Sequence, residues 1–210
     1  MHLRNLLATA AVFATVAFGQ QIAADSPFQV RYASNLNVGD SVVNITNTGA
    51  RGAGLASGTS AAVTGAICAN VYAFSPDEQM VSCCSCPVTP NGLVSLSAQR
   101  DLISNTLTPA VPTSIVIKIL ASTPVGGTCA GSAASPGVLT PGLAAWGTTV
   151  HTNTSPTGGF AVTETAFTPS TLSAGELARL TALCTFINAN GSGFGICRSC
   201  RLGGLGAVTQ

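Results

Sequence analysis

Alternating apolar and polar positions are the main pattern of this chain, and they predict β-strands. In residues 66–74 (AICANVYAF) one set of side chains is aliphatic, and the other carries the cysteine, the amide and the aromatic rings. A period of two with β-branched and aromatic members is typical of a strand. The turn sequences Ser75–Glu78 and Pro87–Gly92 separate this segment from residues 79–84 and 93–97, since proline, aspartate and asparagine favour turns. The pattern therefore predicts a three-stranded antiparallel meander.

More strands are predicted downstream of the meander. Thr113–Ala121 (TSIVIKILA) is mostly apolar on both faces, which favours a central strand buried on both sides of its sheet. Leu143–Thr152 and Phe160–Thr168 are expected to form a hairpin across Asn153–Gly159.

One helix is predicted near the C-terminus, over residues 174–189. Ser173 and Glu176 have the spacing of a capping box. Apolar residues recur at helical spacing and define one buried face, made of Leu177, Leu180, Cys184 and Ile187. Asn190 and Gly191 supply a C-terminal stop. The predicted fold of residues 65–210 is mainly β, an antiparallel β-sandwich with one C-terminal helix, stapled by disulfides.

The first 19 residues have the pattern of a secretory signal peptide. Arg4 precedes the apolar run LLATAAVFATVAFG, and small residues occupy the positions before Gln20. The run is short for a bilayer span, although a retained N-terminal anchor is the alternative. The mature chain is expected to be secreted, extracellular or at the cell surface, with no membrane span.

Residues 20–48 are interpreted as a strand-forming N-terminal arm, and residues 49–64 as a flexible tether. The tether consists almost entirely of small residues. An arm of this kind could fold back as the first strand of its own domain, or it could add to a neighbour's sheet by donor-strand complementation. In the second case the donor residues are Val42, Val43 and Ile45, with Phe28–Ala33 as the alternative donor segment.

Eight cysteines are the clearest candidates for a structural role. They are Cys68, Cys83, Cys84, Cys86, Cys129, Cys184, Cys197 and Cys200. An even number in an exported chain predicts four disulfides. The cluster Cys83–Cys86 cannot pair easily within itself, because adjacent residues of a strand point to opposite faces. Its partners are therefore expected elsewhere in the chain, in a connectivity that the residues leave open. A metal site shared by Cys83–Cys86 and Cys197–Cys200 is the rival interpretation.

The composition of the chain argues against nucleic acid as a partner and favours association of the protein. Only 7% of the residues are charged, far below the quarter or so typical of globular chains. Removal of residues 1–19 takes away Arg4, so seven basic residues then face seven acidic ones. Near-zero net charge promotes association. No cluster of Lys and Arg exists to track phosphates, so nucleic acid is not expected as a partner.

No catalytic constellation is found. His151 lies within a predicted strand, and the chain has no GxSxG nucleophile elbow with which it could form a triad. Glu164 has no obvious second acid beside it. No phosphate-binding loop, dinucleotide fingerprint or zinc-protease motif occurs, so no cofactor is expected. Trp146 is interpreted as a core residue. Asn44, Asn153 and Asn190 lie in Asn-x-Ser/Thr sequons and are candidate glycosylation sites.

Three segments stand out in the body: CANVYAFSPDEQMVSCCSCPVTPNGLVSLS, DLISNTLTPAVPTSIVIKILAS and LSAGELARLTALCTFINANGSGFGICRSC. Through them, and most specifically through the first and the third, which carry cysteines, the chain resembles a group of exported bacterial cysteine-rich β proteins without an established activity. The resemblance covers most of residues 65–204 and implies an exported β-rich product. The order of arm, tether and body is similar, in architecture alone, to pilus and fibre subunits assembled by strand exchange.

These observations lead to three functional hypotheses. The first is a structural subunit of an extracellular or cell-surface filament, a homopolymer formed by insertion of the arm into a neighbour. The second is a monomeric secreted binding module or adhesin for carbohydrate or a surface ligand, with the arm folded into its own body. The third is a hydrolase that uses Glu164 or His151.

Overall fold

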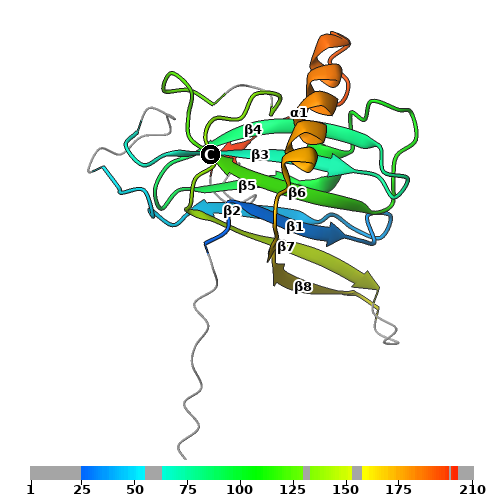
Figure 1. Cartoon of the computed structure of the whole chain (residues 1–210). Coiled ribbons are helices and arrows are strands. Elements are labelled where there is room, and N and C mark those ends of the chain that lie inside the picture. Colours follow the sequence, from blue (N-terminus) through cyan, green and yellow to red (C-terminus); the bar gives the residue numbers. More distant parts are fainter. Residues whose placement is uncertain (1–24, 55–62, 130–132, 153–157, 199, 203–210) are drawn as a thin grey trace, which may run out of the picture.

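The computed structural model describes residues 25–54, 63–129, 133–152, 158–198 and 200–202 (Figure 1). The predicted signal peptide and Asn153 lie outside these residues, as does half of the predicted tether, residues 55–62.

In the described residues, ten strands form two antiparallel sheets of five strands each (Figure 1). Sheet A has the order β4 (Met80–Val88), β3 (Ile67–Phe74), β6 (Ile115–Ser122), β1 (Phe28–Ala33) and β9 (Thr168–Pro169). Sheet B has the order β10 (Arg201–Leu202), β5 (Leu93–Ser97), β2 (Val42–Asn47), β7 (Leu143–Thr152) and β8 (Phe160–Ala166). A π-helical turn, η1 (Ala98–Leu102), follows β5, and the helix α1 (Ala174–Ala189) follows β9. The mainly-β fold with one C-terminal helix is confirmed.

The main core lies between the two sheets, where the inward side chains of both meet. Val43 and Ile45 of β2 pack in the same cluster as Ile117 and Ile119 of β6 and Leu96 of β5. All five side chains are fully buried. Full burial of an aliphatic side chain of this size contributes about 1.5–3 kcal/mol to folding. The apolar side chains that alternate along the strands thus form the core that stabilises the sandwich.

A second core covers the other face of sheet A and explains why its middle strands are apolar on both sides. The helix α1 lies across this face (Figure 1) and buries Leu180, Cys184 and Ile187 against it. Tyr72 of β3 and Leu120 of β6 belong to the same cluster. The prediction that Thr113–Ala121 forms a central buried strand is confirmed, since β6 is the middle strand of sheet A.

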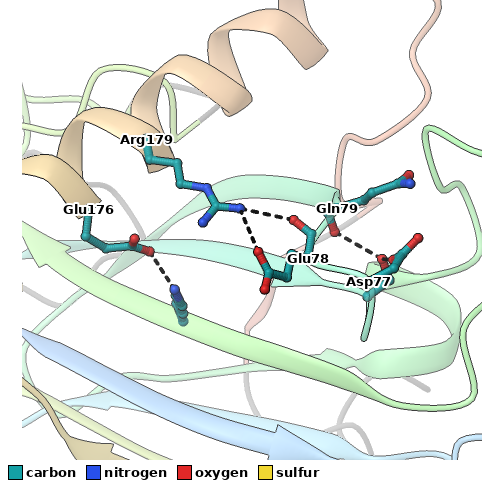
Figure 2. A network of polar contacts seen from close by, with 7 residues as sticks. Asp77, Glu78, Gln79, Glu176 and Arg179 are labelled. Atoms are coloured by element: carbon teal, nitrogen blue, oxygen red, sulfur yellow. Dashed lines mark hydrogen bonds and ion pairs between the residues drawn. The ribbon is translucent and has the colours of Figure 1, made fainter.

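Polar contacts orient α1 on the sheet. The Ser173 hydroxyl accepts a hydrogen bond from the Glu176 amide at 3.1 Å, which is the N-cap expected from the sequence. The Glu176 carboxylate, however, is turned to the Lys118 ammonium of β6 at 2.5 Å (Figure 2), so it pairs with the sheet. One turn further on, Arg179 lies 3.8 Å from the Glu78 carboxylate. This second pair is exposed and contributes little to stability.

The segment interpreted as an arm supplies one strand to each sheet of its own chain. β1 pairs with β6 and β9, and β2 pairs with β5 and β7. The sandwich of the single chain therefore begins at Phe28, ahead of the boundary expected at residue 65. Both arm strands lie inside their sheets, where they make ladder hydrogen bonds on two sides.

Four disulfides are present, and the cysteines of the cluster on β4 all pair outward, as expected. The bonds are Cys68–Cys129, Cys83–Cys184, Cys84–Cys197 and Cys86–Cys200. Because neighbouring residues of β4 point to opposite faces, Cys83 reaches α1 while Cys84 and Cys86 reach the C-terminal segment. Cysteines of the rival metal interpretation are thus oxidised in this structure. Within the described residues no helix is both long and apolar enough to cross a membrane.

Tyr72 makes the stability of this fold decrease at alkaline pH. Its side chain is fully buried, its hydroxyl donates to the Ala133 carbonyl at 2.9 Å, and burial raises the pKa of the phenol. The unfolded chain loses this proton near pH 10, whereas the folded chain retains it. The contribution of Tyr72 to the free energy of unfolding is therefore complete below about pH 10. Above that pH it falls by roughly 1.4 kcal/mol per pH unit, up to the raised pKa.

We expect urea unfolding between pH 9 and pH 11.5 to show this loss, with a steeper decline for the natural chain than for Tyr72→Phe. The substituted chain should start about 1 kcal/mol less stable, because the hydrogen bond is gone. Parallel declines in the two proteins would contradict the prediction.

Candidate ligand-binding site beside Trp146

Trp146 lies on the outer face of sheet B, with 38% of its surface exposed. The prediction that it is a core residue was wrong. Its neighbours Ala145 and Gly147 take the inward positions of β7, and the period of two then turns Trp146 outward. Gly147 leaves room for the Arg31 guanidinium, since a Cβ at this position would lie 2.6 Å from it.

A hollow of about 400 Å³ opens beside Trp146, where the chain crosses from β8 in sheet B to β9 in sheet A. Its walls come from the N-terminal segment, the start of β7 and the end of β8. The lining residues are Asp25, Gln29, Thr48, Leu143, Ala144, Ala145, Trp146, Ala166, Phe167 and Pro169. The surface is mostly apolar, with few polar groups, as is common in ligand sites.

Asp25 provides a fixed carboxylate in this hollow. Its two oxygens accept from the Gly142 amide at 3.0 and 3.1 Å, while the side chain remains exposed. Gln29 is buried, and its amide donates to the Leu143 carbonyl at 2.8 Å. The carboxylate of Asp25 thus has free lone pairs for a ligand, whereas Gln29 mainly positions β7.

A row of polar side chains crosses the sheet next to the indole. Asn44 of β2 lies directly opposite Trp146 in the register of the two strands. It accepts from the Ser95 hydroxyl at 2.7 Å and donates to the Glu164 carboxylate at 3.3 Å. The hydrogen bonds fix the Asn44 amide, and they leave Glu164, which is exposed, as the terminal acceptor of the row.

Positive charge is absent from the described lining of the hollow. Arg31 lies on the inner side of Gly147 and is buried, so it does not face the hollow. Its guanidinium donates to the hydroxyls of Ser41, Thr149 and Thr165 at 2.8–3.2 Å. Burial lowers the pKa of this group. The site therefore presents acceptors and an aromatic face, and it is not suited to an anion.

The two residues considered for hydrolysis are not brought together. His151 and Glu164 have opposite parity in the β7–β8 ladder, since Glu164 pairs with Thr148 and His151 with Ala161. They consequently point to opposite faces of sheet B. His151 contacts the Thr163 hydroxyl at 2.9 Å, and Glu164 contacts Asn44.

The remaining predicted site residues lie away from the hollow, in the core, on the outer face of β2 or at the end of α1. Val43 and Ile45 are buried in the core, and Val42 is half-buried on the outer face of β2. Asn44 is half-buried with its amide engaged, whereas Asn190 is exposed at the C-cap of α1. The alternation around Ala145 and Gly147 was the signal that could have placed Trp146 outside. Nothing in the sequence pointed to Asp25.

Comparison with protein-family models finds no match. Comparison with curated proteins and with solved structures finds no match either.

Proposed function

We propose that this chain is an exported carbohydrate-binding module whose ligand stacks on Trp146. The observation that supports it is the half-exposed indole beside a hollow of about 400 Å³ that also holds the Asp25 carboxylate. A sugar ring offers an apolar face to an aromatic side chain and hydroxyl donors to carboxylates and amides.

Charge supports a neutral ligand. The described lining contains a carboxylate and no cation, and the row from Ser95 through Asn44 to Glu164 extends the acceptors across the sheet. The outer face of sheet B carries one ring and a neighbouring polar row, an arrangement that fits a segment of a neutral oligosaccharide. Binding without turnover is proposed, because Glu164 and His151 point to opposite faces of sheet B.

Trp146 is the only tryptophan of the chain, so its fluorescence reports on this site directly. We expect neutral oligosaccharides, selected on a glycan array, to shift or quench the emission in a saturable titration. Trp146→Ala should weaken binding at least tenfold by isothermal calorimetry, because stacking and the burial of the ring are both lost.

Phe160→Ala is the matched control, since Phe160 is an exposed ring on β8 that does not line the hollow. It should leave the affinity unchanged. Trp146→Phe should bind with intermediate affinity, since it keeps a ring. An array on which the natural chain and Trp146→Ala give the same signals would overturn the proposal.

A filament assembled by strand exchange is the second candidate function. The observation that favours it is the position of β2, which pairs on both sides and connects to β3 through residues 48–66. A neighbour's β2, carrying Val42, Val43 and Ile45, could make the same pairs in an exchanged assembly. Low charge, at 7% of residues, favours such association.

Assembly of the mature chain, Gln20–Gln210, tests this candidate by size-exclusion chromatography and negative-stain microscopy. Strand exchange predicts polymers that grow with concentration during refolding and that a peptide of residues 25–48 blocks. A monomer at every concentration, or assembly indifferent to the peptide, would rule it out.

A further inference from the structure

The strand β8 forms a free edge of sheet B in the described part of the chain. It pairs with β7 alone, and Figure 1 shows it as the outermost strand of the sheet. All seven residues of Phe160–Ala166 are exposed. Phe160 and Val162 are 66% and 62% exposed, which is unusual for large apolar side chains that no partner covers.

The hydrogen-bonding groups at this edge can be assigned from the register. The Phe167 amide donates to the Ala145 carbonyl at 2.8 Å, which makes these two residues a hydrogen-bonded pair at the end of the β7–β8 ladder. Such pairs alternate along an antiparallel ladder. Residues 161, 163 and 165 therefore bond to β7, and the amides and carbonyls of residues 160, 162, 164 and 166 point away from it.

The features that normally prevent an edge strand from pairing with another chain are missing from β8. The segment FAVTETA contains no lysine and no proline, and its pairing with β7 runs without a bulge. Its one charge, Glu164, is turned to Asn44 across the sheet. A seven-residue edge of this kind is a template for another strand.

We propose that two copies of this chain pair through β8, antiparallel, about a two-fold axis at Thr163. Phe160 then lies opposite Ala166 of the second copy, and Val162 opposite Glu164 of the second copy. All the outward amides and carbonyls of the two strands fall into hydrogen-bonded positions, and the two five-stranded sheets become one continuous sheet.

A second copy is the occupant that fits this edge best. The seven residues pair with themselves over their whole length, and the formal net charge of +1 gives little repulsion between copies. An isologous contact of this kind closes at a dimer. Its axis is perpendicular to the sheet, so both Trp146 residues lie on the same side, roughly 25 Å apart by strand spacing and rise. Bivalent binding through them rests on the proposed function, whereas the dimer does not.

Three substitutions at Val162 test both the dimer and its register in the mature chain. Val162→Glu places like charges opposite each other at two symmetric positions, and we expect the dimer dissociation constant to rise about tenfold. Val162→Lys places opposite charges there, and the dimer should be retained or tighter. Val162→Pro removes an outward amide without touching the β7 ladder, and it should yield monomers.

Sedimentation equilibrium measures the association, and thermal unfolding at low protein concentration verifies that each variant folds. Equal weakening by Glu and Lys would overturn the proposed register, because it would indicate that Val162 faces itself or acts only through its apolar surface. A monomeric natural chain at high micromolar concentration would overturn the dimer. Dissociation by the peptide of residues 25–48, but not by Val162→Pro, would assign the association to strand exchange.

Discussion

A chain that begins at Thr48 is expected not to fold into the sandwich. The deletion removes β1, which lies between β6 and β9, and β2, through which β5 and β7 are joined. Both sheets lose an interior strand, and the buried side chains of Val43 and Ile45 leave the core. The loss exceeds the 5–15 kcal/mol by which a typical domain is stable. Urea titrations followed by near-ultraviolet circular dichroism should show no cooperative transition.

A chain that begins at Asp25 is the matched control, because it keeps both strands and should unfold cooperatively. A peptide of residues 25–48 added during refolding of the truncated chain should restore a transition, since it supplies the missing ladders in trans. A cooperative transition from the truncated chain alone would contradict the prediction. It would mean that residues 65–210 fold without the arm.

Removal of the Cys83–Cys184 disulfide has the second largest expected effect. This bond joins β4 to α1 across 101 residues of sequence. Because the neighbouring Cys84–Cys197 bond already closes most of that loop, removal of Cys83–Cys184 opens a loop of only about 15 residues, which is worth about 3 kcal/mol in the chain-entropy estimate. In Cys83→Ala with Cys184→Ala we expect the free energy of unfolding to fall by about that amount. The helix α1 should also detach locally, because only non-covalent contacts then hold it, chiefly those of Leu177, Leu180, Leu183 and Ile187 and the Lys118–Glu176 pair.

Hydrogen exchange measures the detachment as lost protection of the α1 amides. Cys68→Ala with Cys129→Ala is the control, since that bond spans 61 residues and joins β3 to a loop. It should destabilise the chain while α1 keeps the protection that it has in the natural protein. Retained protection of α1 in the first variant would show that apolar packing alone holds the helix.

Local patterns in the sequence determined the secondary structure of this protein. Residues 115–121 are apolar on both faces, and a segment of this kind can only be stable in the middle of a covered sheet, where β6 lies. The helix over residues 174–189 follows from Ser173, the helical spacing of Leu180, Cys184 and Ile187, and the stop at Gly191. The outward pairing of the β4 cysteines follows as well, because neighbouring strand residues cannot converge.

The candidate site was not predictable in the same way. Asp25 and Trp146 are separated by more than a hundred residues, and they line one hollow only because β1 and β7 lie in facing sheets. The inward or outward choice for Trp146 depended on what lies across the core. Residue 147 faces the Arg31 guanidinium, and a glycine fits there because a Cβ would lie 2.6 Å from that group.

Pairing between distant segments was decided by the tertiary structure alone. Strand alternation tells which residues share a face, but it does not tell which strand lies beside which, since any two β-strands can form a ladder. The arm is therefore compatible with its own sheets and with a neighbour's, and its place between β5 and β7 depends on the whole arrangement of sheet B. The disulfide connectivity follows the same rule, because it depends on which strand and helix bring two sulfur atoms together.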